Sequence, residues 1–507
     1  MSAKWVLGVV ASVVVCAASA IELGAPFTDG AVLQRDRPVR VWGRAAAGAR
    51  VTVAFGGSCA TATADARGDW RVELPAMSAS KTPRELVASA AEGEARVRDV
   101  LVGEVWLAAG QSNMEMPLGG GMNRFRDEAG LLLRQYVRRA DIRFLPMTEY
   151  NRISARPLRT TKAKWVRVTP ETVGELSAVA WYFAEELNRA LDVPVGVVSA
   201  HVGGTGIDAW TPREGYDLHP ELAEMAAYPV TEDWNAKLKK GPVTSRNQQP
   251  TVLYNLMVAP VTPYQLRGAI WYQGEHNVFE KGATGAYSVK MHALFDGWRR
   301  TFENPAMKLY FAQIAPFDYE ATDPTSGANG YLPRLQIEQA KFAAEETNAA
   351  MVVTGDVGSL GDVHPHEKAS VGRRLAMLAL KNDYGFGGIV AESPTLAKAR
   401  VAGDVVQLDF DGVETWHVYR PDRTTDLTFE VLDRNGAWRP ADVLNMHVPN
   451  GYWDAQHGCV PTNRLVVGAR NVPTPRGVRY LFSLPFRGGL RSNWGLPLGP
   501  FEWRDDK

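Results

Sequence analysis

Between residues 101 and 384, short apolar runs alternate with longer segments whose apolar residues recur at helical spacing. The runs of strand length lie at 102–109, 195–200, 269–273, 309–314 and 351–355. The segments with helical spacing lie at 176–191, 287–302, 335–349 and 368–380. Because strands and helices alternate, this pattern predicts an α/β region built from βαβ units around a mostly parallel sheet.

The two ends of the chain have a different pattern of short alternating stretches broken by turn residues. Near the start, the apolar alternation occupies 39–42, 51–55 and 70–74; after Gly385 it continues at 401–410, 427–432 and 478–484. Such spacing is typical of antiparallel β domains. We therefore predict a β domain at 21–100, a central α/β domain at 101–385 with an insertion at about 214–249, and a second β domain at 386–507.

The first twenty residues have the composition of a secretory leader. Lys4 precedes an apolar stretch at 5–18, and the small residues Ala18, Ser19 and Ala20 follow it. This order predicts a signal peptide cleaved after Ala20, and hence a secreted or periplasmic protein without a membrane anchor after cleavage. A retained anchor helix is the alternative, although the apolar run is short for a membrane span.

Charge and composition narrow the possible classes of protein. The 507 residues include 56 basic and 56 acidic side chains, a formal net charge of zero. This balance lacks the basic excess typical of nucleic-acid binding, and 45% hydrophobic with 22% charged residues argues against a disordered chain. Without the leader only Cys59 and Cys459 are left, and the sequence leaves their pairing open.

The first polar motif follows the predicted strand at 102–109, where small residues lead into Gln111 and Ser112. Small residues before a serine allow a sharp turn that presents the hydroxyl at the sheet edge, as a nucleophile requires. The alternative is that Ser112 is simply a helix N-cap. A second motif, Gly203 and Gly204, follows the strand at 195–200 and suits either an oxyanion site or a turn with positive φ.

Two further motifs carry groups suited to acid–base chemistry. Gln273 ends the predicted strand at 269–273 and Glu275 follows it; the neutral amide of Gln273 suits the stabilisation of an oxyanion. Asp362 and His364 precede the helix at 368–380, and an imidazole beside a carboxylate is what activates a serine. His276 is either an acid–base partner of Glu275 or a solvated loop residue.

A metal site is the rival interpretation of the histidines. It would draw ligands from His364, His366, Glu367 and the distant His276, but the sequence has neither an HExxH motif nor paired cysteines. We therefore expect no metal and no cofactor. Motifs for dinucleotide and nucleoside-triphosphate binding, GxGxxG and GKS/T, are also absent, as is the GxSxG elbow of α/β-hydrolases.

The order of these motifs resembles the SGNH-type hydrolases, and within them the sialate O-acetylesterase family of carbohydrate esterases. The resemblance rests on GQSNME at 110–115, GGTGIDAW at 203–210, GAIWYQGEHN at 268–277 and DVHPHEK at 362–368. It implies a three-layer α/β/α SGNH-hydrolase domain with a mostly parallel sheet, flanked by N- and C-terminal β domains.

Position by position, the resemblance implies roles for individual residues. Ser112 matches the nucleophile and His364 the catalytic base. The implied oxyanion donors are the amides of Ser112 and Gly203 and the side chain of Gln273. The substrate contacts we expect are Gln111, Glu275 and Trp271.

The acid of the triad is less clearly marked in this sequence. In many SGNH enzymes an aspartate stands three positions before the histidine, and here that position is Gly361. Asp362 is the first choice, and Glu275 or Asp356 can substitute for it through space. A bare Ser–His pair that orients on a backbone carbonyl is a further alternative.

The implied activity is that of a serine esterase that removes O-acetyl groups from carbohydrate through an acetyl-serine intermediate, with O-acetylated sialic acid as the first-choice substrate. Acetylated xylan or another glycan is the alternative substrate, and a non-catalytic carbohydrate-binding protein is the alternative class. The expected partner is an O-acetylated carbohydrate and not nucleic acid. Trp210 and Tyr272 either stack on a sugar or belong to the core. Arg124, Arg126 and Arg246 either meet a sialic carboxylate or are solvated surface residues.

Overall fold

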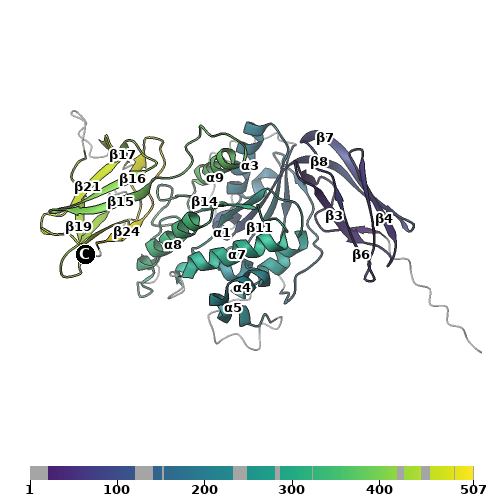
Figure 1. Cartoon of the computed structure of the whole chain (residues 1–507), viewed down its shortest axis with the longest axis horizontal. Coiled ribbons are helices and arrows are strands. Elements are labelled where there is room, and N and C mark those ends of the chain that lie inside the picture. The colour runs from purple at the N-terminus through teal and green to yellow at the C-terminus, as the bar shows by residue number, and fades with distance from the viewer. Residues whose placement is uncertain are drawn as a thin grey trace, which may run out of the picture.

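A computed structural model of the chain describes residues 21–119, 141–150, 153–231, 248–279, 286–321, 324–419, 428–446, 457–484 and 486–505. Figure 1 shows a mixed α/β centre with a β-rich region at each end. The leader predicted at 1–20 lies outside the described residues. Within the described ranges, no helix combines the length and apolar character that a membrane crossing requires.

The central sheet is mostly parallel, as the alternating pattern predicted. Its strand order is β10-β9-β11-β8-β12-β13-β14, and only β10 pairs antiparallel along this path. The strands are β8 (Gly93–Gly110), β9 (Ile142–Pro146), β10 (Val166–Arg167), β11 (Val195–His201), β12 (Gly268–Tyr272), β13 (Lys308–Ala312) and β14 (Ala349–Val352). The pattern did not predict β9 or β10, which are short and carry arginines within the strand.

All four predicted helices of the central region are present. They are α3 (Ala178–Leu191), α7 (Tyr287–Thr301), α8 (Leu332–Glu345) and α9 (Lys368–Asp383). The Ser177 side chain caps α3 by accepting a hydrogen bond from the Ala180 amide. The helix predicted at 335–349 is displaced by about a turn from α8, because the helix ends at Glu345 and Ala349 already belongs to strand β14.

Successive residues of β8 contribute to two separate hydrophobic cores. Leu107 belongs to one core together with Trp298 of α7, whereas Trp106 belongs to the other core together with Trp181 of α3. Because side chains alternate between the faces of a strand, the two cores lie on opposite sides of β8. Helices α8 and α9 contribute to the first and the second core, respectively.

The N-terminal β region shares a strand with the central sheet. The first part of β8 pairs antiparallel with β7 (Ser80–Ala90) and parallel with β2 (Val32–Gln34), and its last part pairs with β11 and β12. The rest of the region is β1 (Glu22–Leu23), β3 (Val39–Arg44), β4 (Arg50–Phe55), β5 (Ser58–Thr63) and β6 (Asp69–Leu74). The pattern change at Leu101 therefore falls inside one continuous strand.

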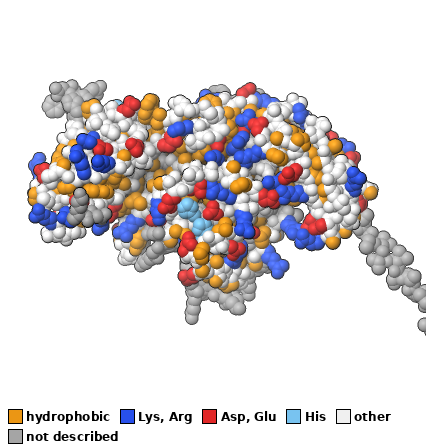
Figure 2. All heavy atoms as spheres, viewed as in Figure 1, with side chains coloured by type: hydrophobic (Ala, Val, Ile, Leu, Met, Phe, Trp, Pro, Cys, Tyr) orange, Lys and Arg blue, Asp and Glu red, His pale blue; other side chains and the backbone are white. Residues whose placement is uncertain are grey.

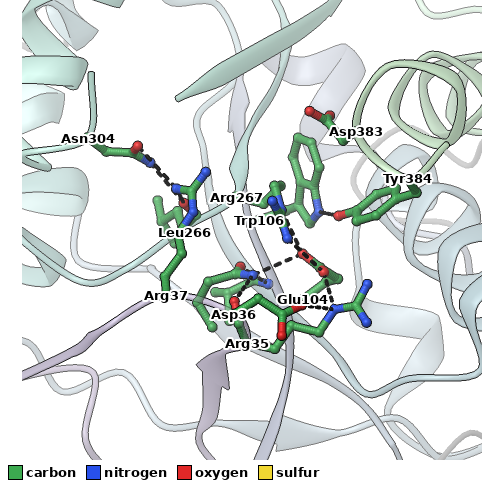
Figure 3. Close-up of polar contacts among 12 residues, drawn as sticks. Arg35, Asp36, Arg37, Glu104, Trp106, Leu266, Arg267, Asn304, Asp383 and Tyr384 are labelled. Atoms are coloured by element: carbon green, nitrogen blue, oxygen red, sulfur yellow. Dashed lines mark hydrogen bonds and ion pairs between the residues drawn. The ribbon is translucent and has the colours of Figure 1, made fainter. Parts of the chain in front are cut away.

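A buried ion-pair cluster joins the N-terminal region to the start of the central sheet (Figure 3). Glu104 is fully buried. Its carboxylate accepts hydrogen bonds from Arg35 Nε at 2.5 Å and from Arg267 Nε at 3.1 Å. Burial alone would raise the pKa of Glu104, but the hydrogen bonds from Arg267 and Arg35 bring it below its ordinary value. The Glu104 carboxylate therefore stays charged, and its ion pairs connect Arg35 of the N-terminal region with Arg267 of the central region.

The C-terminal region has its own core, which includes the fully buried Trp416. Its larger sheet runs β15 (Thr395–Ala402), β16 (Val405–Asp411), β21 (Arg464–Gly468), β19 (Trp438–Val443), β18 (Phe429–Leu432), β22 (Gly477–Tyr480) and β24 (Phe501–Arg504). A three-stranded sheet holds β20 (His457–Val460), β17 (Trp416–Tyr419) and β23 (Leu490–Ser492). The single strand predicted at 401–410 is wrong, because a turn with Gly403 at φ +69° divides it into β15 and β16.

The remaining described elements are short or lie at the surface. The expected insertion at about 214–249 contains α4 (Arg213–Leu218) and α5 (Ala223–Ala227), and residues 232–247 lie outside the described residues. Cys59 and Cys459 are both free and lie on different sheets. Figure 2 shows basic and acidic side chains mixed over the visible face, as expected for a chain of zero net charge.

Candidate active site

The candidate site begins at a tight turn between β8 and the short helix α1 (Ser112–Glu115). Gly110 has φ +145°, and a Cβ at this position would lie 2.2 Å from the carbonyl oxygen of Tyr272, so only glycine fits. Gln111 occupies the N-cap position without a side-chain capping bond, and Ser112 is the first helical residue. The alternative that Ser112 is the helix N-cap is therefore wrong, and its hydroxyl lies at the carboxyl end of β8.

The structure brings Ser112 and His364 together from positions 252 residues apart. The Nε2 atom of His364 lies 2.9 Å from Ser112 Oγ, within hydrogen-bond distance. Burial lowers the pKa of His364, the positive charge of Lys368 lowers it further, and the Asp362 carboxylate opposes the shift. A neutral imidazole at neutral pH can accept the Ser112 proton, so this pair has the geometry of an activated nucleophile.

Asp362 lies beside this pair without a close bond to the imidazole. One carboxylate oxygen accepts a 2.8 Å hydrogen bond from the His364 backbone amide and lies 3.6 Å from His364 Nδ1. The other carboxylate oxygen lies 3.5 Å from Nε2 of His366. The distance to Nδ1 exceeds a normal hydrogen bond, so Asp362 acts on the ring mainly through its charge in this conformation.

The other two candidate acids have different partners. Asn113 donates a short hydrogen bond to Glu275. The carboxylate of Asp356 accepts two hydrogen bonds from the Arg374 guanidinium, at 2.8 and 2.6 Å. It also forms an ion pair with Arg491 at 3.3 Å. Asp362 is thus the carboxylate among the three for which the structure records a contact with His364.

Gly203, for which the resemblance implies an oxyanion donor, lies next to Ser112. A Cβ on Gly203 would lie 3.3 Å from Ser112 Cβ, and the following Gly204 has φ +69°. The Gly203 amide donates a 2.6 Å hydrogen bond to Oε2 of Glu115, whose pKa burial raises. Before this amide can bind an oxyanion, the carboxylate of Glu115 has to leave it.

Gln273 differs from the expectation that its side chain faces the nucleophile. It is fully buried, and its Nε2 donates to Asn277 Oδ1 at 2.6 Å, to the Thr205 carbonyl at 3.0 Å and to Gln111 Oε1 at 3.2 Å. Its Oε1 accepts a 2.6 Å bond from the Tyr287 hydroxyl. Because both amide hydrogens already have acceptors inside the fold, Gln273 is not an open oxyanion donor in this conformation.

Gln111 and Trp271, two of the expected substrate contacts, are also buried. Gln111 is 4% exposed, and its side-chain oxygen accepts hydrogen bonds from Gln273 and from the loop that follows β12. Trp271 is fully buried and makes edge-on ring contacts with Trp210 and Trp298, at centroid distances of 6.1 and 5.7 Å. Neither side chain has a face open to a sugar, so both support the fold around the site.

Lys368 and Asn113 also lie near Ser112, although the sequence pattern assigned them no role. Lys368 is 2% exposed and donates a 2.5 Å hydrogen bond from Nζ to Asn113 Oδ1. The sequence could have indicated Asn113 and Lys368, because they lie inside the motifs GQSNME and DVHPHEK. Phe279, which is 52% exposed, ends the short helix that follows the Gln273 motif, and its ring meets the Tyr319 ring edge-on at a centroid distance of 5.3 Å.

Three histidines proposed as ligands of the alternative metal site, His276, His364 and His366, have other partners near them. His276 Nδ1 lies 3.4 Å from Gln248 Nε2, whereas His364 faces Ser112. Among the residues that the structure describes, no group of three or more His, Cys, Asp or Glu side chains is arranged to hold a metal ion. The arginines considered for a sialic carboxylate, Arg124, Arg126 and Arg246, lie outside the described residues.

Comparison with known proteins gives results in agreement with the motif order. Residues 102–381 match the family of carbohydrate esterases described as sialic acid-specific acetylesterases. Curated sialate O-acetylesterases include one from Rattus norvegicus, 27% identical over 69% of each chain, and one from Mus musculus, 27% identical over 80% of this chain and 81% of its own.

A solved structure extends the similarity to nearly the whole chain. The crystal structure of a carbohydrate acetylesterase from Xanthomonas citri is 31% identical, covers 95% of this chain and 99% of its own, and superposes with a TM-score of 0.79. Both β-rich flanking regions are therefore part of the shared fold. The resemblance inferred from the motifs is confirmed: the chain belongs to the carbohydrate esterase family of sialic acid-specific acetylesterases, whose members are carboxylic ester hydrolases.

Proposed function

We propose that this protein is a serine esterase that removes O-acetyl groups from carbohydrate, with O-acetylated sialic acid as its main substrate. The observation that carries the proposal is the 2.9 Å contact between Ser112 Oγ and His364 Nε2. Membership of the sialic acid-specific acetylesterases and the names of the curated relatives support the choice of substrate.

The proposed reaction proceeds in two acyl-transfer steps. His364 Nε2 takes the proton of the Ser112 hydroxyl as the oxygen attacks the acetyl carbonyl, whose π electrons move to its oxygen. The tetrahedral intermediate collapses, the bond to the sugar oxygen breaks, and the imidazolium returns the proton to that oxygen. Water then gives a proton to the same imidazole as its oxygen attacks the acetyl-serine. The bond to Ser112 Oγ breaks, the imidazolium returns the proton to that oxygen, and acetate leaves.

We place the developing oxyanion at the amides of Ser112 and Gly203, after the carboxylate of Glu115 has moved away. Backbone amides suit this role because they stabilise negative charge without losing a proton. The Gln273 side chain is omitted from this set because its hydrogens bind Asn277 and Thr205. It instead supports the loop behind the nucleophile.

For the acid of the triad we propose Asp362. Its charge opposes the lowering of the His364 pKa, and it already holds the backbone amide of that residue at 2.8 Å. A carboxylate here stabilises the imidazolium that forms during each step. In the proposed mechanism Oδ1 and Nδ1, which lie 3.6 Å apart in this conformation, approach to hydrogen-bond distance.

We further propose that the central region, 101–385, is a three-layer α/β/α SGNH domain between β domains at 21–100 and 386–507. The two cores on opposite sides of β8, one with α7 and α8 and the other with α3 and α9, support this arrangement. We also keep the proposal of a leader at 1–20 that directs the protein to the periplasm or the cell exterior.

The test measures acetate release from 9-O-acetylated sialic acid and from acetylated xylan by the wild type and by Ser112→Ala. We expect the wild type to prefer the sialic acid, and Ser112→Ala to lose about a thousandfold or more in kcat. A preference for acetylated xylan would overturn the assignment of O-acetylated sialic acid as the main substrate. Equal background hydrolysis of p-nitrophenyl acetate by both proteins would instead favour a carbohydrate-binding protein.

A further inference from the structure

A buried polar network adjoins the Ser112–His364 pair, and the proposed mechanism does not use it. We define the Lys368 network as the Lys368 ammonium, the Asn113 side-chain amide, the Glu275 carboxylate and the Val363 carbonyl. Lys368 Nζ donates to Asn113 Oδ1 at 2.5 Å; Asn113 Nδ2 donates to Glu275 Oε1 and, at 3.0 Å, to the Val363 carbonyl.

Each member of the network is adjacent to a group that the mechanism uses or to a loop that surrounds it. Asn113 follows Ser112, and Val363 precedes His364. Glu275 lies in the loop after β12, and Lys368 is the first residue of α9. The amide of Asn113 therefore connects the nucleophile turn directly to the histidine loop.

A lysine in this position is costly to bury and calls for an explanation. Lys368 and Glu275 are 2% and 4% exposed, and Asn113 is fully buried between them. Transfer of an ammonium out of water is unfavourable unless opposite charge and hydrogen bonds compensate it. For Lys368 the compensation comes from Asn113, from the charge of Glu275 and from the Tyr272 ring, whose centroid lies 5.6 Å from Nζ.

We propose that Lys368 is a positioning residue of the esterase reaction, which through Asn113 holds the Ser112 turn at bonding distance from His364. This inference rests on the proposed function. Removal of the ammonium would leave Asn113 Oδ1 without this donor and would free the amide to rotate away from Val363. Small displacements of a nucleophile from its base are expensive, on the order of a hundredfold in rate per ångström.

The charge of Lys368 also acts on the imidazole. The groups that face the ammonium are Glu275 and Tyr272 from the β12 side and Asp362 and His364 from the histidine loop. Burial lowers the pKa of Lys368 to about 7, against the effect of the two carboxylates. In its charged form, Lys368 lowers the pKa of His364 and so keeps the imidazole neutral and able to accept a proton.

The decisive variant is Lys368→Met, which keeps an unbranched side chain one atom shorter and removes its charge and donor. We expect kcat on O-acetylated sialic acid to fall roughly ten- to hundredfold. The acid limb of the kcat/KM profile should also move to higher pH, because the charge that lowers the His364 pKa is gone. Lys368→Arg keeps the charge and should return the limb toward its wild-type position.

The matched control is Lys381→Met, at the other end of the same helix. Lys381 pairs with Glu392 at a partly exposed site, away from the network. This variant should keep the wild-type kcat and the wild-type pH profile. A Lys368→Met enzyme that also keeps both would overturn the proposal.

Two further measurements separate positioning from folding and from the proposed function. Asn113→Ala removes the amide that links the Ser112 turn to Lys368 but leaves the charge of Lys368. The value of kcat should therefore fall while the acid limb of the kcat/KM profile stays in place. A wild-type kcat in this variant would overturn the proposal, even if Lys368→Met fails to fold. NMR titration of the His364 ring, assigned with His364→Ala, needs no activity. A higher His364 pKa in Lys368→Met than in wild type is expected, and an equal value contradicts the electrostatic part whatever substrate the enzyme uses.

Discussion

The carboxylate of Glu115 accepts a 2.6 Å hydrogen bond from the backbone amide of Gly203, which is the amide that the proposed mechanism assigns to the oxyanion. Glu115 therefore places a carboxylate oxygen on this donor in the free protein. Any ligand that brings a carboxylate or an oxyanion to the same amide has to compete with it.

This competition predicts a change in product inhibition. In Glu115→Ala the Gly203 amide is free, so we expect acetate to inhibit about tenfold more strongly, the equivalent of one hydrogen bond of about 1.4 kcal/mol. The measurement is the inhibition constant of acetate at fixed pH. Glu115→Gln, which keeps an uncharged acceptor, should lie between the two, and an unchanged constant in Glu115→Ala would show that acetate binds elsewhere.

The pH dependence of activity should follow the titration of His364. Its pKa lies below the ordinary value of 6.5, because burial and Lys368 both disfavour the charged ring. The neutral base is therefore present over a wider acidic range, and kcat/KM should fall only as pH drops through this lowered value. An acid limb with its midpoint above 6.5 would contradict the surroundings described for His364.

For Gln273 we expect a loss of stability to accompany any loss of activity. Gln273→Leu removes a buried amide whose hydrogen bonds reach Asn277, Thr205, Gln111 and Tyr287. Since partners left unsatisfied cost about 1–3 kcal/mol each, urea unfolding should show a decrease of at least about 2 kcal/mol in unfolding free energy. Unchanged stability together with a hundredfold lower kcat would instead support Gln273 as an oxyanion donor.

Trp271 and Phe279 provide a matched pair of aromatic substitutions. Trp271 is fully buried against Trp210 and Trp298, so Trp271→Ala should cost about 3–5 kcal/mol of stability through the cavity it leaves. We expect Phe279, which is 52% exposed just after the Gln273 motif, to contact the substrate, so Phe279→Ala should raise KM severalfold with little change in thermal midpoint. An opposite pattern, with KM raised by Trp271→Ala in a protein of normal stability, would place the sugar against Trp271.

Much of the architecture could be predicted because it depends on local periodicity. Apolar spacing located α3, α7 and α9 to within a few residues, since an amphipathic helix repeats its buried face every few positions. The same reasoning failed at β9, where Arg143 interrupts the apolar run. That arginine is nearly buried because Asp99, 44 residues away, pairs with it at 2.9 Å.

The resemblance carried by the motifs also paired Ser112 with His364, whose Nε2 lies 2.9 Å from Ser112 Oγ in the structure. It did not separate groups that face the reaction from groups that support it. Gln273 and Trp271 stand in the same motif, next to the predicted strand end, and both are fully buried.

The sequence by itself therefore determined the family, the alternation of strands and helices, and the residue types available at the site. The tertiary structure alone decided that Asn113 binds Lys368, 255 residues away, and that Glu115 lies on the amide of Gly203. The physical reason is range: periodicity records which side of an element is buried, whereas the partner of a buried polar group depends on which distant segments pack together.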